Sequence, residues 1–459
     1  MSLYTSTTSK KAKNQFIMEI LPQLEKWVAN CNSSRIAFEL ARKQLNDTLD
    51  KIESIDELNE INDKSWLIQL LESLTYFLFD KVSQPNNKRL ISNASKIWGI
   101  IEDNHHEHSL SINILIEDLR PHLLRNKNEK VIKQSNKNVG LNPKLGLSLK
   151  EDNIRDEWYK NNEFKYIGTF HFILTKLQHH DLSGNLWWII PGILNLMDDT
   201  NHFEDVKIPS IELFYQLLEC FTKDTSESAN KWISIQDSGL YDLFEPPLKN
   251  MLYFTPPSFP QEQTLAIWSS VYPVLIKLCE LQYNYPPADP HQYNGMLINL
   301  ANEVILQHSI PRCAFKHEIL LLFGLNELID ILKIVGEPSI LIFQRIVYVV
   351  GETLVSDPFF TLFDSVIDVI IKLIHTLIKI CPQERIIAHR FDLIGLIVLI
   401  TIKCDKEGKL AENTRLNSLQ QLIYELNNIG VDTSAIQEQL IKEDSYKDII
   451  IKLFTYKEL

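Results

Sequence analysis

Residues Ser183–Phe221 read SGNLWWIIPGILNLMDDTNHFEDVKIPSIELFYQLLECF, and their pattern decides the predicted fold. Apolar residues recur at steps of three and four in two arms, which is the spacing of one face of an α-helix. A polar stretch separates the arms, so the segment is predicted to form a helical hairpin. The apolar stripes are Leu186, Ile189, Ile190, Ile193, Leu194 and Met197 in the first arm, and Ile211, Phe214, Leu217, Leu218 and Phe221 in the second. The residues predicted to be core are Ile190, Ile193, Leu194, Leu217 and Leu218.

Polar residues and a proline indicate where each arm begins and ends. Ser183 is predicted to cap the first helix, because its hydroxyl can accept a hydrogen bond from an unpaired backbone N–H. Asp198 and Asp199 are predicted to close the turn, with Asp199 bonded to N–H groups at the start of the second arm. Pro209 fits the first turn of that arm, where a missing N–H removes no helical hydrogen bond.

A second proline gives the hairpin a resemblance to a known repeat. Pro191 lies inside the first arm, where it removes one hydrogen bond and is predicted to kink the helix. A mid-helix proline, an aspartate about two turns later (Asp199) and a following Val206-Lys207 pair resemble the repeat unit of HEAT-type α-solenoids. The loop between Asp199 and Val206 is slightly longer than in the usual repeat. We therefore predict an all-α fold, an α-solenoid of degenerate HEAT-like helical repeats.

The composition agrees with a packed helical protein. The chain has 459 residues, 45% of them apolar, and only 14 glycines. Its net charge of −13 argues against a general nucleic-acid binder, because phosphate binding needs a basic face. The most apolar run, between Asp392 and Lys403, is ten residues long, whereas a membrane span needs about 20. We expect neither a nucleic-acid partner nor a membrane partner.

The cysteines and the N-terminus indicate the compartment. The six cysteines have no CxxC spacing, so we interpret them as reduced core thiols. The N-terminal residues MSLYTSTTSKKAKNQ contain no apolar segment, and we expect no secretory signal. The expected localisation is cytoplasmic and nuclear.

The chain is predicted to have four regions. These are a disordered N-terminus (1–13), a helical region (14–120), a basic flexible linker (121–152) and a HEAT-like solenoid (153–459). The linker follows from the stretch 120–150, which carries eight basic residues and one acidic residue and has no helical stripe. Docking of this segment on an acidic partner surface, or on nucleic acid, is the alternative. Helix breaks in the solenoid are predicted at Pro246-Pro247, Pro311, Gly336–Pro338, Asp357-Pro358 and Cys381-Pro382.

Motifs for catalysis or metal binding give weak signals. The sequence contains no GxGxxG, GxxxxGK[ST] or GxSxG motif. His105, His106 and His108 form a histidine-rich cluster, but they lack a cysteine partner, so we interpret the cluster as a solvated helix end. His179-His180 is interpreted in the same way. Asp198-Asp199 could act as an acid–base pair, but adjacent residues between helices more often close a turn. We predict no enzymatic activity, no cofactor and no metal.

The adjacent tryptophans Trp187 and Trp188 point to a surface. Neighbouring positions on a helix are about 100° apart, so both rings cannot face one core. We predict that Trp187 is the more exposed of the two, and that an exposed ring could anchor a partner. The candidate repeat-motif and partner-surface residues are Trp187, Trp188, Pro191, Asp198, Asp199 and Lys207.

Four blocks share their residue order with one known family. They are Leu186–Asp199 with Val206-Lys207, Asp237–Leu278, the helices around Leu320–Gly336, and the turn Ser356–Phe359. Together, from about Trp158 to Ile402, they resemble the Tel-two-interacting protein two (Tti-two) family. The first 120 residues match only in helical character. The chain departs from the family at Pro209-Ser210, where a glycine commonly follows the Val-Lys pair.

The resemblance implies a scaffold and no catalysis. Proteins of this family join Tti-one and Tel-two in the Triple-T cochaperone complex. With the heat-shock-ninety chaperone system, that complex supports the maturation and stability of phosphatidylinositol 3-kinase-related kinases. The resemblance implies Tti-one as the direct partner. The alternative is a karyopherin-like transport solenoid or another helical-repeat protein-binding adaptor, although 459 residues are few for a karyopherin.

Overall fold

The computed structural model describes residues 71–72, 75, 108–123, 165–200, 202–222, 233–283, 290–410, 414–442 and 446–455. They belong to two compact units, one formed from residues 1–234 and the other from residues 235–459. Every regular element among the described residues is a helix. The predicted N-terminal region 1–13 and most of the predicted linker 121–152 lie outside the described residues, and the predicted domain boundaries stay predictions.

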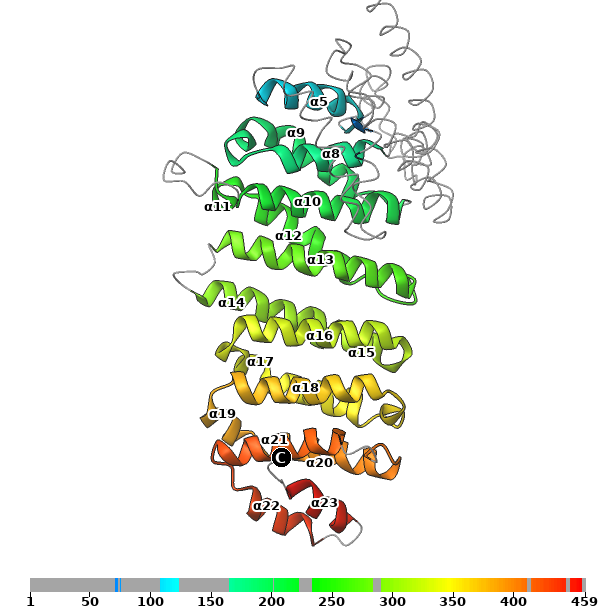
Figure 1. Cartoon of the computed structure of the whole chain (residues 1–459), viewed down its shortest axis with the longest axis vertical. Helices are drawn as coiled ribbons and strands as arrows, with labels where there is room; N and C mark the ends of the chain where they lie inside the picture. Colours follow the sequence, from blue (N-terminus) through cyan, green and yellow to red (C-terminus); the bar gives the residue numbers. More distant parts are fainter. Residues whose placement is uncertain are drawn as a thin grey trace, which may run out of the picture. The chain divides into compact units, whose positions relative to one another are not determined.

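The first unit places the central hairpin beside two further helices (Figure 1). Helix α10 packs on both α8 and α9, and α5 also contacts α8 and α9. A short π-helix, η2, connects the two arms and packs on both of them. The described elements are α5 (His108–Leu123), α8 (Lys165–Lys176), α9 (His179–Met197), η2 (Phe203–Lys207) and α10 (Ile208–Cys220).

The second unit is a stack of helical pairs that follow one another along the chain (Figure 1). Its first helices are α11 (Ile235–Ser238), α12 (Leu240–Met251), α13 (Gln261–Gln282), α14 (Pro290–Asn299), η4 (Leu300–Ser309), α15 (Ile310–Cys313), η5 (Ala314–His317) and α16 (Glu318–Val335). They are followed by η6 (Glu337–Ser339), α17 (Ile340–Tyr348), η7 (Val349–Val355), η8 (Phe360–Leu362), α18 (Asp364–Ile380), α19 (Gln383–Ala388), α20 (Arg390–Lys406), α21 (Thr414–Asn428), α22 (Thr433–Leu440) and α23 (Lys447–Phe454).

The stack of the second unit has two layers. In one layer α13, α16, α18 and α21 contact one another in succession, and in the other η4, α17 and α20 do so. Each pair buries its apolar stripes against the pairs before and after it, which is how a solenoid builds a continuous core. The predicted fold class, all-α with HEAT-like helical repeats, is confirmed.

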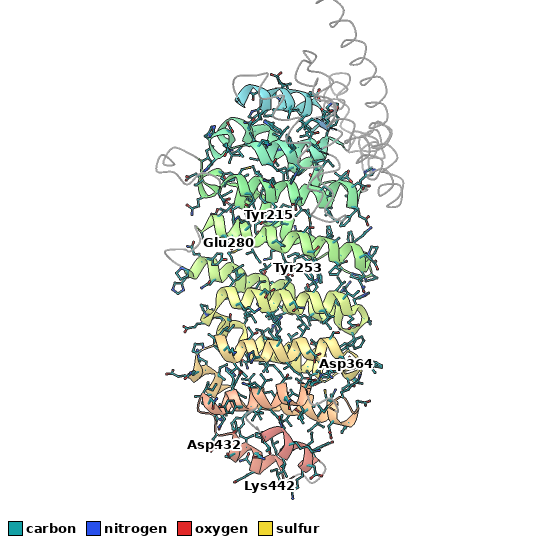
Figure 2. All side chains as sticks on the ribbon, viewed as in Figure 1. Tyr215, Tyr253, Glu280, Asp364, Asp432 and Lys442 are labelled. Carbon is teal, nitrogen blue, oxygen red and sulfur yellow. The ribbon has the colours of Figure 1, made fainter. Side chains whose placement is uncertain are left out.

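Side chains fill the space between neighbouring helices in both units (Figure 2). The core is mainly aliphatic, and α18 alone buries Val366, Ile367, Ile370, Ile371, Leu373, Ile374, Thr376, Leu377 and Ile378. The five described cysteines are free and buried, as expected for core thiols. At the end of the stack, Asp432 caps α22 by accepting a hydrogen bond of 3.0 Å from the Ala435 N–H.

Two predicted helix breaks are wrong. Helix α12 continues through Pro246-Pro247, and a continuous helix runs from Pro290 to Cys313 through Pro311. Around the first pair, the buried side chains of Phe244 and Leu248 hold the helix in place, so packing offsets the lost hydrogen bonds. The second break comes three residues late, at Ala314, where φ is +38°. The predicted breaks at Gly336–Pro338, Asp357-Pro358 and Cys381-Pro382 are confirmed.

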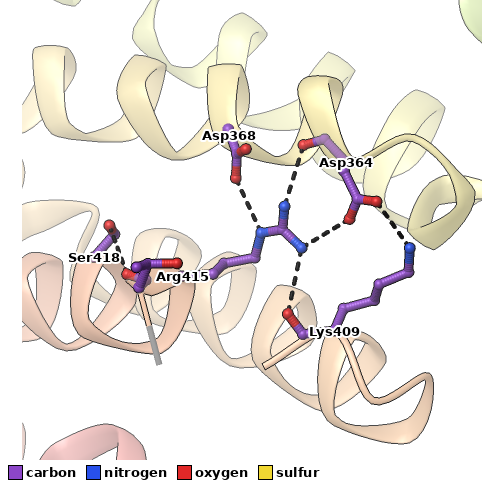
Figure 3. Close-up of polar contacts among 6 residues, drawn as sticks. Asp364, Asp368, Lys409, Arg415 and Ser418 are labelled. Carbon is purple, nitrogen blue, oxygen red and sulfur yellow. Dashed lines mark hydrogen bonds and ion pairs between the residues drawn. The ribbon is translucent and has the colours of Figure 1, made fainter. Parts of the chain in front are cut away.

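An ion-pair network ties α21 to α18 (Figure 3). The Arg415 guanidinium donates from Nε to Asp368 Oδ1 and from Nη1 to Asp364 Oδ1, both at 2.9 Å. Lys409, just after α20, donates to the other oxygen of Asp364 at 2.8 Å. The hydrogen bond from Lys409 and the neighbouring Arg415 hold the pKa of Asp364 below its usual value. The network therefore links α18 to α21 and to the loop after α20 through charged groups at the surface.

Two helical stretches of the second unit are long and apolar enough to cross a membrane by length and composition alone. They are Gln261–Gln282 and Glu337–Val355, of which 50% and 44% are buried inside the protein. Helices of a packed core pass the same test, and both stretches contact neighbouring helices of the stack. Packing thus accounts for the buried apolar residues of each stretch.

Candidate functional site

The first arm of the hairpin begins earlier than the sequence indicates. Helix α9 starts at His179, and the Asp181 carboxylate accepts a hydrogen bond of 3.0 Å from the Gln178 N–H. Ser183 is exposed inside the helix, so the predicted cap at Ser183 is wrong. The aspartate provides the start signal, because its side chain reaches back to the backbone three residues earlier.

The two tryptophans of α9 lie in opposite environments. Trp188 is fully buried, its Nε1–H donates to Asn185 Oδ1 at 2.8 Å, and its ring lies 5.3 Å from that of Phe170. Trp187 is 58% exposed, and the Arg120 guanidinium lies 5.1 Å from its ring centroid. The prediction that Trp187 is the more exposed ring is confirmed. A cation over its face orients the exposed ring without covering it.

Pro191 and Gly192 let α9 approach its neighbours closely. Pro191 lies in the helix interior and is exposed, so the Trp187 carbonyl one turn earlier has no proline N–H to accept. A Cβ on Gly192 would lie 3.3 Å from Phe170 Cε1 and 3.4 Å from Leu123 Cδ1. Gly192 is therefore a contact residue, which the sequence pattern did not indicate because a glycine adds nothing to an apolar stripe.

Replacing Gly192 by leucine is expected to lower the free energy of unfolding of the first unit by about 1–3 kcal/mol, because the new side chain has no space beside Phe170. The matched control is Gly184→Leu on the same helix, where nothing lies within 4 Å of the new Cβ. That control is expected to be neutral or stabilising by about 0.5–1 kcal/mol, since leucine suits a helix better than glycine. Amide hydrogen exchange in α9 and α10 measures both. Equal protection in the two variants would contradict the close approach.

The turn between the arms is closed by a buried clip made of Asp199 and Lys207. Asp199 Oδ1 accepts a hydrogen bond of 2.7 Å from the His202 N–H, and the Asp199 carbonyl accepts one of 3.0 Å from Lys207 Nζ. Both residues are buried. Asp199 was predicted to bond to N–H groups that open the second arm. It accepts from one N–H, that of His202 before η2, whereas α10 begins only at Ile208.

The burial and pairing of the charged groups indicate that the clip has a structural role. Burial lowers the pKa of the Lys207 ammonium, and the carboxylates of Asp198 and Asp199 oppose that shift. Lys207 is 8% exposed, and its ammonium donates to a backbone carbonyl. The ammonium therefore cannot reach a substrate in solution. Asp198 is exposed whereas Asp199 is buried, and the two carboxylates do not form an acid–base pair.

The six candidate residues thus divide into two sets. Trp188, Asp199 and Lys207 are buried and shape the hairpin. Trp187 and Pro191 are exposed on α9, and Asp198 is exposed directly after its last residue. We call these three residues the α9 outer stripe, because positions four and eleven residues apart share one side of a helix. The stripe presents an aromatic ring, a rigid proline and a carboxylate to solvent.

The described histidines that were weighed as metal ligands contact protein groups instead. His179 Nε2 lies 2.9 Å from the Ile233 carbonyl, and His180 lies 3.3 Å from Asp181. Within the described ranges, no group of three His, Cys, Asp or Glu is placed to hold a metal ion. His105 and His106 lie outside those ranges.

Each unit packs its helices around an apolar core. Such packed helices, with short breaks and the buried turn clip of the first unit, define a helical-repeat protein of the HEAT-like class. The chain belongs to the Tti2 family, whose model matches residues 70–362. This confirms the resemblance to the Tti-two family. The matched segment begins well before Trp158, so the family resemblance reaches further into the N-terminal region than the four blocks indicated.

One curated relative and one solved structure are similar to this chain, to very different degrees. TEL2-interacting protein 2 of Saccharomyces cerevisiae is 39% identical over 379 residues, which cover 81% of this chain and 87% of the relative. A circular tandem repeat protein with novel repeat topology aligns over 96% of both chains at 14% identity, with a TM-score of 0.33. That structural likeness is too low to support an argument.

Proposed function

We propose that this chain is a non-enzymatic scaffold subunit of the Triple-T cochaperone complex. It binds Tti-one directly and, through Tel-two and the heat-shock-ninety chaperone system, supports the maturation and stability of phosphatidylinositol 3-kinase-related kinases. It acts in the cytoplasm and the nucleus. The observation that carries this proposal is membership of the Tti2 family, at 39% identity to a protein named for its interaction with TEL2.

The geometry of the hairpin supports a binding role. The α9 outer stripe exposes Trp187, and large aromatic side chains dominate the binding energy of many protein interfaces. Arg120 beside it adds a second residue type that is frequent in such interfaces. The buried clip of Asp199 and Lys207 keeps the end of α9 rigid, so the stripe is presented without an ordering cost on binding.

Co-expression with the Tti-one and Tel-two orthologues, followed by size-exclusion chromatography, tests the proposal. The three chains are expected to elute together, and the chain is expected to bind Tti-one when Tel-two is left out. Elution of the chain alone in both mixtures would overturn the scaffold proposal. Recovery of a small nuclear GTPase from lysate in place of Tti-one would favour the karyopherin-like alternative.

A further inference from the structure

A groove in the second unit separates the exposed sides of α17–η7 and α20. Its volume is about 330 Å³, and its lining comes from both helices, with Tyr348 and Glu352 on one side and Asp392 and Leu399 on the other. Both elements belong to the same layer of the stack and contact each other. The volume lies at the lower end of the range for binding pockets, which leaves room for one or two side chains.

Two glycines keep the floor of the groove open. A Cβ on Gly395 would meet nothing within 4 Å, and one on Gly351 would meet only Leu396 Cδ1, at 3.9 Å. Glycine costs stability inside a helix, so a glycine in each of the two elements that line the groove, with space for a larger residue, needs another reason. Gly351 also lies in the π-helix η7, and π-turns inside helices occur frequently at functional sites. The groove is thus a built depression in the surface.

Exposed residues of the two helices form what we call the rim of the groove, with three large apolar side chains beside the polar Gln344 and Arg345 of α17. Leu341 and Tyr348 on α17 are 76% and 61% exposed, and Phe391 on α20 is 58% exposed. Helix α18, the other member of the same repeat, serves as an internal comparison. Its exposed residues are Asp364, Ser365, Asp368, Lys372 and Lys379, all of them polar. An apolar rim on only one helix of the pair indicates a surface that is covered by a partner.

The acidic lining of the groove favours a partner with a basic side chain. The charged side chains that line the groove are those of Glu352 and Asp392, both acidic. No lysine, arginine or histidine is among its lining residues. His389 pairs with Asp392 at 3.2 Å, and the Arg390 guanidinium lies over the Phe391 ring at 4.3 Å, both at one end. A partner therefore needs apolar side chains for the rim and a basic side chain for the two carboxylates.

The length and shape of the groove favour a helix. From Phe391 to Leu399 the exposed side of α20 extends about 12 Å, which is the length of two to three helical turns. The walls are helices, so the backbone offers no free strand edge to an extended peptide. Of the residues i, i+3, i+4 and i+7 on the inner side of such a helix, one or two enter the groove and the others lie along its rim.

We propose that the groove between α17–η7 and α20 binds an amphipathic helix of a partner protein, with a lysine or arginine flanked by apolar residues on its inner side. The proposal deepens the proposed function and rests on it: the helix belongs to a subunit of the Triple-T complex. The basic side chain lies between Glu352 and Asp392, and the apolar residues cover Tyr348, Phe391 and Leu341.

Filling the groove tests the proposal in the full-length chain. Gly395→Gln puts a side chain into the open floor and suits the helix better than glycine, so the variant is expected to fold. The matched control is Gly295→Gln in α14, another helical glycine with nothing within 4 Å of the new Cβ. We expect Gly395→Gln to weaken the binding of co-expressed Tti-one and Tel-two at least tenfold, and Gly295→Gln to change it less than twofold.

A photo-crosslinking amino acid at Tyr348 identifies the occupant in the assembled complex. The expected product joins position 348 to a helical segment of Tti-one or Tel-two that contains a lysine or arginine, while a crosslinker at Lys372 on α18 gives none. Full complex formation by Gly395→Gln, or a crosslink to a second copy of this chain, overturns the groove proposal and leaves the proposed function standing. Failure of the unmodified chain to bind either protein overturns both.

Discussion

Trp188→Ala is expected to lower the free energy of unfolding of the first unit by about 3–5 kcal/mol, whereas Trp187→Ala lowers it by less than about 1 kcal/mol. Trp188 is fully buried against Phe170, so its removal leaves a cavity and strips Asn185 Oδ1 of its donor. Trp187 is 58% exposed and loses only the contact with Arg120. The two substitutions are adjacent in sequence and chemically identical.

Hydrogen exchange of the α9 and α10 amides measures both variants, because a chain of two units need not unfold in a single transition. For partner binding we expect the opposite order, with the larger effect from Trp187→Ala. If the α9 outer stripe binds Tti-one, Trp187→Ala weakens that binding at least tenfold, and the exposed control Glu204→Ala in η2 does not. Equal loss of stability in both tryptophan variants would contradict the burial, and undiminished binding by Trp187→Ala would exclude the stripe from the interface.

The sequence predicted the hairpin but not the side of α9 that packs. Ile193, Leu217 and Leu218 are buried as predicted, whereas Ile190 and Leu194 are only half-buried. The buried side of α9 is rotated toward Trp188 and Gly192, two positions four residues apart. The rotation follows from Gly192, where Phe170 and Leu123 come close enough to touch a Cβ. A glycine adds no apolar side chain to a stripe, so the pattern pointed to the neighbouring row.

Other features depend on contacts that no local pattern contains. Pro246-Pro247 and Pro311 predicted helix breaks, but tertiary packing holds both helices together. Lys207 was predicted as a repeat-motif or partner-surface residue, and the structure encloses its ammonium in the turn that it closes. The π-turns η2, η4 and η7 have no sequence signature that we could have used. The sequence also contained no indication of the groove beside η7, because its two glycines come from separate helices.

The second large effect concerns a half-buried carboxyl group in the second unit. Burial, with a smaller contribution from Asp330, raises the pKa of Glu327 on α16 to about 7. Tyr272 on α13 faces the same group, since the Glu327 charge contributes to the raised pKa of the Tyr272 hydroxyl. In the unfolded chain the carboxyl titrates at its ordinary value of about 4.3. Between these two values the folded state keeps a proton that the unfolded state has lost.

The sign of the pH dependence follows from that difference. Because the folded state binds more protons, the stability of the second unit falls as the pH rises from about 4.5 to about 7, and then stays level. A difference of two to three pKa units corresponds to roughly 3 kcal/mol, which solvent screening at a half-exposed site reduces to about 1–3 kcal/mol. Glu327→Gln, which carries no charge at any pH, is expected to be more stable than the unmodified chain by that amount at pH 8 and equal to it near pH 4.5.

Hydrogen exchange of the α16 and α13 amides between pH 5 and pH 8, corrected for the intrinsic exchange rate, measures this difference. Asp330→Asn is the matched control on the same helix, since Asp330 is exposed and pairs with Lys333 at 2.9 Å. Removing the Asp330 charge lowers the pKa of Glu327, so this control should reduce the slope in the unmodified chain without abolishing it. A stability of the unmodified chain that follows Glu327→Gln at every pH would show that the carboxyl is solvated in the folded state. The packing of α16 against α13 would then be looser at Glu327 than the enclosed position of Tyr272 requires.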